Sequence, residues 1–216
     1  MKKLESSLLN MVLVLTGSAV IMGCILAWVN SLTAAPIQQQ KEKALADGIR
    51  TVMCTDALNV TETSTVDSYV IYKVADNAQQ PLGAAVESTA MGFGGNLKVL
   101  VGFSADGNIL GYTLLEHQET PGLGAKADVW FQQGQKGDII GKSPAEPLTV
   151  SKDGGQIDAI TASTITSRAF LKVVNNAYQA FKNESVDAQS GASTQVKTPH
   201  PLPLTLYPSP FTIAQL

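Results

Sequence analysis

Residues 158–170, with the sequence DAITASTITSRAF, are rich in hydroxyl side chains. Five of the seven residues between Thr161 and Ser167 are serine or threonine. A helical pattern begins directly after them, at Arg168, so the hydroxyls precede a predicted helix. Serine and threonine often cap helices, and the unpaired amides at a helix N-terminus also favour an anion such as a phosphate group. The segment therefore allows two interpretations: helix capping, or attachment of a phosphate group to one of the hydroxyls.

The predicted helix that follows, residues 168–181, has one apolar face. Phe170, Val174, Ala177 and Phe181 recur at helical spacing, and the polar residues between them fall on the opposite side. We expect this helix to pack against a sheet. Its start would place Thr164, Thr166 and Ser167 at its N-terminus.

The sheet is predicted from short β-rich segments. Residues 69–74 and 82–88 have strand composition, and residues 97–103 and 109–116 form a predicted hairpin with Asp106-Gly107 at its turn. The glycines of residues 92–95 do not form a dinucleotide-binding loop, because position 97 is leucine and no Gly-Lys-Ser/Thr follows. We expect them to be turn residues.

A second turn is predicted at residues 119–124. Pro121-Gly122 is a favoured central pair of a type II turn, which fixes a backbone corner and exposes amide groups. The sequence alone gives this segment no further role.

An apolar segment near the N-terminus predicts a membrane anchor. Residues 8–29 carry no charge, and as a helix they would extend roughly 33 Å, enough to cross a bilayer core. A cleaved signal peptide ending near Ala35 and a lipoprotein acylated at Cys24 are the two alternatives. Both fit less well, because the apolar segment is longer than a signal core and continues beyond Cys24.

Basic residues set the expected orientation of the anchor. Lys2 and Lys3 precede the apolar segment, which places residues 1–7 in the cytoplasm and the chain beyond about residue 30 on the periplasmic side. Residues 36–49 read as a helix that begins at Pro36 and leaves the membrane. Ala19, Gly23 and Ala27 recur every fourth residue, a spacing that favours a protein partner in the membrane.

Composition excludes other classes of function. The net charge of −3 offers no basic surface for nucleic acid, and Cys24 and Cys54 have neither metal-ligand nor disulfide spacing. Residues 185–216 hold half of the prolines and predict a disordered tail. The expected fold is α+β: one transmembrane helix, then a periplasmic domain at residues 36–184 with an antiparallel sheet and flanking helices.

Residues 158–164 resemble the flavinylation motif of the FMN-binding domain family, whose members include the G subunit of the Rnf electron transport complex and the C subunit of the sodium-pumping NADH:quinone reductase. In that motif an Asp is followed by Ser/Thr, Gly, Ala and the Thr that carries FMN through a phosphoester. The acceptor maps onto Thr164, and Thr161 fills the earlier hydroxyl position. Ala162 and Ser163 depart from the family's Gly and Ala, and Ala162 would matter if its position needed a positive φ.

The resemblance extends over residues 5–182, including the 92–95 glycines, the hairpin and the 119–124 turn, and it places the FMN-binding region at about residues 90–182. It implies FMN bound covalently to Thr164 after reaction with a flavin transferase. Asp158 would orient or deprotonate Thr164, or else cap a turn. The other residues implied near the flavin are Thr161, Ser163, Glu119, Thr120, Gly122, Leu123 and Gly124.

The implied function is electron relay within an ion-translocating ferredoxin:NAD oxidoreductase (Rnf) complex, beside other membrane subunits. The sequence has no nicotinamide, iron–sulfur or quinone motif and no metal site, so we expect an electron-carrying subunit and not a complete enzyme. The alternatives are an anchored FMN-binding sensor or scaffold, and the C subunit of the quinone reductase. A lipoprotein with a plain capped helix at Thr164 is a further one.

Overall fold

The computed structural model describes residues 8–55, 58–66, 68–76 and 78–190. The chain divides into two compact units, residues 1–43 and 44–216. The predicted cytoplasmic segment, residues 1–7, and most of the predicted tail lie outside the described residues.

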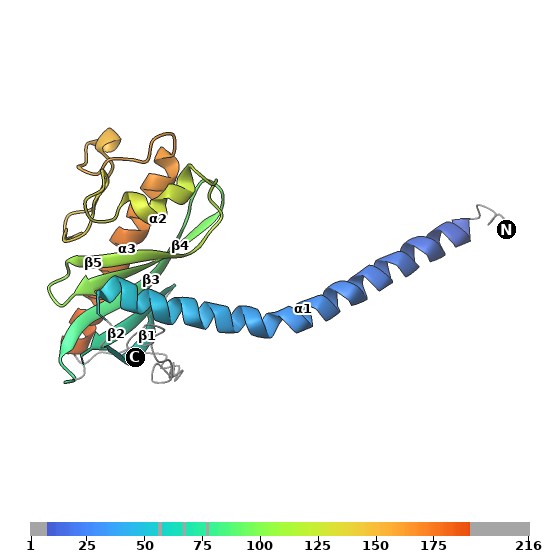
Figure 1. Cartoon of the computed structure of the whole chain (residues 1–216), viewed down its shortest axis with the longest axis horizontal. Helices are drawn as coiled ribbons and strands as arrows, with labels where there is room; N and C mark the ends of the chain where they lie inside the picture. Colours follow the sequence, from blue (N-terminus) through green and yellow to red (C-terminus); the bar gives the residue numbers. More distant parts are fainter. Residues whose placement is uncertain (1–7, 56–57, 67, 77, 191–216) are drawn as a thin grey trace, which may run out of the picture. The chain divides into compact units, whose positions relative to one another are not determined.

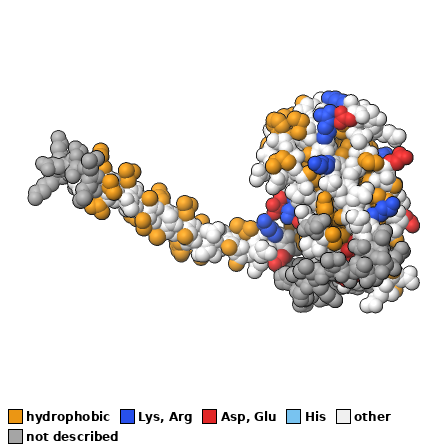
Figure 2. Space-filling model, turned by 180° about the vertical axis from the view of Figure 1, so that it is seen from behind, with side chains coloured by type: hydrophobic (Ala, Val, Ile, Leu, Met, Phe, Trp, Pro, Cys, Tyr) orange, Lys and Arg blue, Asp and Glu red, His pale blue; other side chains and the backbone are white. Residues whose placement is uncertain are grey.

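Helix α1, Leu8–Met53, belongs to both units. Its N-terminal part is long and apolar enough to cross a membrane, and its apolar side chains are exposed along the helix (Figure 2). The predicted separate helix from Pro36 is wrong, because α1 continues through that proline. Proline there removes the hydrogen bond to the carbonyl of Leu32, and Leu32 is exposed, so other donors can reach this carbonyl.

A five-stranded antiparallel meander forms the centre of the second unit, in the order β1-β2-β3-β4-β5 (Figure 1). The strands are β1 Asn59–Val66, β2 Tyr69–Ala75, β3 Pro81–Met91, β4 Asn96–Ser104 and β5 Ile109–His117. The two predicted strands and the predicted hairpin are confirmed. Strand β1, NVTETSTV, was not predicted, because its polar composition lacks the apolar alternation of a half-buried strand.

Helices cover both faces of the sheet. Val99, Val101 and Phe103 of β4 point to the core beneath α3, Thr164–Ser190, whereas Leu100 points to the core beneath the end of α1. On the α1 side, Gly102 and Gly111 lie opposite each other on β4 and β5, and Val52 packs against both, so closely at Gly102 that a Cβ would clash. The α+β fold is thus confirmed.

Helix α3 differs from the prediction at both ends. It begins at Thr164, four residues before the predicted start at Arg168, because Ser163, the residue before the helix, is bonded to its first turn: the amide and hydroxyl of Ser167 donate to the carbonyl of Ser163, and the Ser163 hydroxyl donates to Thr166. It continues to Ser190, into the segment predicted to be a tail. Of the predicted apolar face, Phe170, Val174 and Ala177 are fully buried, and Phe181 is half-buried against the same core.

The segment between β5 and α3 holds three short helical turns: η1 Gly124–Lys126, α2 Ala127–Trp130 and η2 Ser151–Asp153. Phe131, directly after α2, stacks on Phe170 of α3 at 4.3 Å between ring centroids. The Tyr112 hydroxyl of β5 donates to the carbonyl of Ala127 (2.7 Å) and accepts from the amide of Phe131 (3.1 Å), and burial raises the pKa of this phenol. These contacts hold α2 and Phe131 against β5 and the N-terminal part of α3.

Candidate functional site

The predicted acceptor, Thr164, is the first residue of α3 and is half-buried. Its Oγ1 accepts a hydrogen bond from Nζ of Lys152 in η2 at 3.0 Å. Sequence reasoning missed Lys152, since an isolated lysine in an irregular segment carries no signal of its own. The structure therefore places a cation directly on the predicted acceptor oxygen.

The other hydroxyls of the segment have separate roles. Ser167 Oγ donates to the carbonyl of Ser163 (3.0 Å) and accepts from the amide of Ile160 (2.9 Å), which closes the turn before α3. Ser163 Oγ donates to Thr166 Oγ1 at 2.9 Å, and both side chains are buried. Thr161 is exposed in the turn. Neither Thr166 nor Ser167 caps an amide of the first turn of α3: the hydroxyl of Ser167 accepts from an amide that precedes the helix, and that of Thr166 bonds to the side chains of Ser163 and Glu119.

Glu119 joins three segments through one buried carboxylate, with 5% of the residue exposed. Its Oε2 accepts from the Thr166 hydroxyl (2.8 Å), and its Oε1 accepts from the amides of Phe93 (2.7 Å) and Gly94 (3.3 Å). Sequence reasoning gave Ser163 no role beyond the motif. In the structure it starts a chain of hydroxyls that ends on Glu119. The carboxylate itself is turned into the protein.

The 119–124 segment contains the predicted turn. The amide of Leu123 donates to the carbonyl of Thr120 (3.1 Å), and Gly122 has φ +77°, the value that a type II turn needs at its third residue. Gly124 lies so close to Glu119 and Thr166 that a Cβ would clash. This close packing holds the turn against the first turn of α3.

The glycines of residues 92–95 form the β3–β4 turn, as predicted. Gly92 donates to the carbonyl of Gly95 at 2.8 Å. A Cβ on Gly94 would clash with the carbonyl of Gln118, so the turn packs directly on the chain beside Glu119. The β3–β4 turn, the 119–124 segment and the start of α3 thus meet at Glu119.

Asp158 bonds to neighbours other than Thr164. Its Oδ1 accepts from the Ser151 hydroxyl (3.2 Å), and its carbonyl accepts from Nε1 of Trp130 (2.8 Å). Ser151 is the first residue of η2, the turn that carries Lys152. In this structure Asp158 supports the turn that presents the lysine, which is closer to the second of its two expected roles.

Arg168 and Asp153 form a two-pronged ion pair beside the acceptor. Arg168 Nε and Nη2 donate to the two carboxylate oxygens of Asp153 at 2.7 and 2.6 Å. Hydrogen bonds from Arg168 hold the pKa of the Asp153 carboxyl below its usual range. This pair links η2 to α3 one helical turn beyond Thr164.

Ala162 has φ +61°, in the left-handed region. It occupies the motif position where the FMN-binding domain family usually has glycine. A side chain in this conformation costs about 1 kcal/mol or more, because Cβ crowds the following carbonyl.

We therefore expect Ala162→Gly to stabilise the domain by roughly 0.5 kcal/mol, since strain relief exceeds the entropy cost of glycine. Thermal melting of the variant measures the effect. Ala159→Gly, in the same segment but without a positive φ, is the matched control and should destabilise. An unchanged or lower melting temperature for Ala162→Gly would show that the backbone at Ala162 is not strained.

Comparisons with known proteins place the chain in a family. An FMN-binding domain model matches residues 92–179. The G subunit of the ion-translocating oxidoreductase complex of Shewanella baltica is 37% identical over 182 residues, covering 76% of this chain and 85% of that protein. The corresponding G subunit of Vibrio cholerae is 33% identical over 183 residues, covering 77% and 87%. The chain belongs to this G-subunit family.

Among solved structures, NqrC of Shewanella oneidensis is similar at 23% identity and a TM-score of 0.42, over 63% of this chain and 72% of that one. The FMN-binding domain model covers the β3–β4 turn, Glu119 and Thr164 together. The residues that meet at the start of α3 therefore lie within the part of the chain that matches the FMN-binding domain.

The donors around Thr164 suit the phosphate group of FMN. The amides of Thr164 and Ile165, which are half-buried and exposed residues, have no acceptor within the helix, and no side chain of the described residues accepts from them. Lys152 adds a positive charge at the hydroxyl. A phosphate bound at this site of the G-subunit protein would meet both the helix amides and an ammonium group.

Apolar side chains suited to a flavin ring lie on the three segments that meet at Glu119. Phe93, Leu123 and Ile165 are 68%, 41% and 53% exposed. Phe93 belongs to the β3–β4 turn, Leu123 to the 119–124 turn, and Ile165 follows the acceptor. The exposed apolar surface on these segments matches what an isoalloxazine ring would cover.

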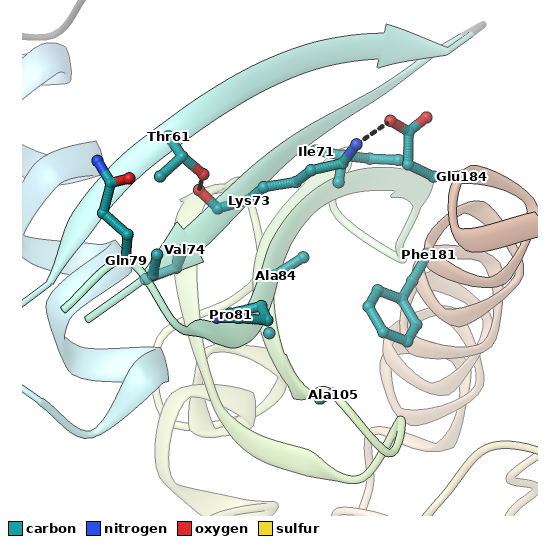
Figure 3. A pocket seen from close by; sticks show the side chains of 12 residues that line it. Thr61, Ile71, Lys73, Val74, Gln79, Pro81, Ala84, Ala105, Phe181 and Glu184 are labelled. Carbon is teal, nitrogen blue, oxygen red and sulfur yellow. Dashed lines mark hydrogen bonds and ion pairs between the residues drawn. The ribbon is translucent and has the colours of Figure 1, made fainter. Parts of the chain in front are cut away.

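A cavity of about 280 Å³ lies elsewhere in the domain, where the C-terminal part of α3 meets strands β1 to β3 (Figure 3). Its lining is mostly apolar, and Lys73 pairs there with Glu184 at 2.9 Å. Glu184 lies twenty residues along α3 from Thr164, or roughly 30 Å at the rise of an α-helix. This cavity is therefore separate from the acceptor site.

Proposed function

We propose that this member of the G-subunit family is a membrane-anchored flavoprotein whose FMN is joined through its phosphate to Thr164. One observation carries the proposal: Thr164 begins α3 with a half-buried hydroxyl that receives a hydrogen bond from Lys152. A hydroxyl in the FMN-binding domain, with a cation on its oxygen and free helix amides beside it, suits a bound phosphodiester.

Thr164 is the nucleophile when the cofactor is attached. In the active site of a flavin transferase, its Oγ1 attacks the flavin-side phosphorus of FAD, and the new O–P bond replaces the bond to AMP. AMP leaves with the electron pair, and the threonine proton passes to a base of the transferase. Positioning and charge stabilisation account for most of the rate of such transfers. This chain therefore supplies an accessible, oriented hydroxyl.

The bound FMN would supply the redox chemistry, and the chain's residues would hold it in place. Thr164 provides a covalent tether, so the carrier is not lost by diffusion. Glu119 keeps the β3–β4 turn and the 119–124 turn beside the tether. Electrons would pass between this site and the other membrane subunits of the complex.

Helix α1 anchors the protein in this proposal. The uncharged residues 8–29 would cross a bacterial inner membrane, with the N-terminus in the cytoplasm and the flavin domain in the periplasm. A tether suits that location, because FMN released there could not easily be replaced.

The proposal predicts a fluorescent protein band. We expect the full chain, produced with a flavin transferase, to retain yellow fluorescence on a denaturing gel under ultraviolet light, because a phosphoester survives denaturation. The same chain produced without the transferase is the control and should be dark. A dark band in the presence of an active transferase would refute covalent attachment.

A further inference from the structure

Lys152 is a cation whose described partner is a hydroxyl group. The other lysines for which ion pairs are described, Lys73 and Lys98, each contact a carboxylate at about 3 Å. Among the described residues no carboxylate pairs with Lys152, and its Nζ instead donates to Thr164 Oγ1 at 3.0 Å. The lysine therefore brings an unneutralised positive charge to the acceptor oxygen.

The turn that carries this lysine is attached to α3 at two neighbouring points. Thr164 and Arg168 are four residues apart and lie on the same face of the helix. Lys152 contacts the first, and the adjacent Asp153 is bound by the second through two hydrogen bonds. Ser151 adds a third attachment, to Asp158. Every residue of η2 thus has a side-chain bond that holds the turn in place.

Arg168 does not bring a second unneutralised charge to the acceptor oxygen. Its Nε and Nη2 are both bound to Asp153, at 2.7 and 2.6 Å. An arginine engaged in this way keeps η2 in position and has its charge neutralised locally. The free charge at the site is that of Lys152.

We propose that Lys152 is the charge partner of the phosphoryl group on Thr164, held in place by the Arg168–Asp153 pair. This inference rests on the proposed function. Before attachment, the ammonium group stabilises negative charge on Oγ1 as its proton leaves. Afterwards, the phosphodiester carries one negative charge on oxygens bound to the same phosphorus as Oγ1, within reach of Nζ. Attachment thus supplies the counter-ion that Lys152 lacks.

The rate of flavin attachment tests the first part. Full-length chain is incubated with purified flavin transferase and FAD, and covalent flavin is followed by fluorescence on denaturing gels. We expect Lys152→Met to slow attachment about tenfold, the effect of losing one charge-assisted hydrogen bond. Lys152→Arg should restore most of the rate. Lys172→Met, an exposed lysine two turns along α3, is the matched control and should leave the rate unchanged.

Thermal melting with and without attached flavin tests the second part. If Lys152 is the charge partner of the phosphate, flavin attachment should raise the melting temperature of the wild type more than that of Lys152→Met, and added salt should reduce this difference. A purely structural lysine would lower the melting temperature of both forms equally. If Lys152→Met folds normally but takes no flavin at all, the rate measurement already supports the proposal.

The outcomes separate the two proposals. If the wild type stays dark with active transferase, covalent attachment and the role of Lys152 both fall. If the wild type is labelled and Lys152→Met matches it in rate and in melting shift, only the role of Lys152 is overturned.

Discussion

Thr164→Val will leave the chain without covalent flavin while the domain stays folded. Valine matches threonine in shape but has no oxygen to attack phosphorus, so the loss should be complete. The hydroxyl of Thr164 bonds to the exposed Lys152, and not to the buried network of Ser163, Thr166 and Glu119. We therefore expect a melting temperature within a few degrees of the wild type, because surface changes of this kind cost about 0.5 kcal/mol.

Neighbouring hydroxyls provide the controls for this variant. Thr161→Val and Ser163→Ala remove the nearest alternative acceptors, and both proteins should still be labelled. Ser163 is buried and its hydroxyl donates to Thr166. Ser163→Ala should therefore lower the melting temperature while leaving the amount of attached flavin nearly unchanged. Fluorescence that persists in Thr164→Val and disappears in either control would move the acceptor to that residue.

The same variant separates a relay from a sensor. In membranes that contain the complete complex, Thr164→Val should abolish ferredoxin-dependent NAD reduction if this flavin carries the electrons. An anchored sensor or scaffold would leave that reaction intact. The amount of assembled complex must be measured alongside, because loss of assembly would lower the activity without any role in electron transfer.

Sequence patterns predicted most of the secondary structure. The hairpin of β4 and β5 and the buried face of α3 follow from periods of two and 3.6 residues, which depend only on local order. Strand β1 was missed because its sequence, NVTETSTV, is mostly polar, and the strand is held by pairing with its neighbour β2. Tertiary pairing outweighed local composition there.

Only some residues of the functional site were predicted from the sequence. The 119–124 turn follows from its Pro121-Gly122 pair, and the structure brings this turn to the start of α3. Thr164 as the acceptor follows from the resemblance to the flavinylation motif and stays a prediction. Lys152 could not be found, because its contact with Thr164 depends on how η2 folds back over the helix. The inward direction of Glu119 was equally hidden, since it depends on amides 25 and 26 residues away in sequence.

Glu119→Ala should produce the largest loss of stability at this site, about 3 kcal/mol. The change removes the acceptor of the fully buried Thr166 hydroxyl, which costs about 1–3 kcal/mol when left unpaired. It also removes the acceptor of the amides of Phe93 and Gly94, which belong to exposed residues and lose about 0.5–1.5 kcal/mol each. Removing a buried negative charge recovers part of that cost. The lost hydrogen bonds still outweigh this gain, because in the wild type the three donors already compensate most of the cost of burying the charged carboxylate. A shift of roughly 6–12 °C in melting temperature follows for a domain of this size.

Glu119→Gln distinguishes the hydrogen bonds from the charge. The amide oxygen of glutamine can keep both backbone donors, and its NH₂ group can donate to Thr166 Oγ1 once the Thr166 hydroxyl turns to donate to Ser163. We expect this variant to lose only about 1 kcal/mol, the difference between a charged and a neutral acceptor. Thermal melting of the full chain in detergent, followed through the fluorescence of its two tryptophans, Trp28 and Trp130, compares the two variants. If glutamine is as damaging as alanine, the negative charge of Glu119 is what matters and the three-donor network does not explain its burial.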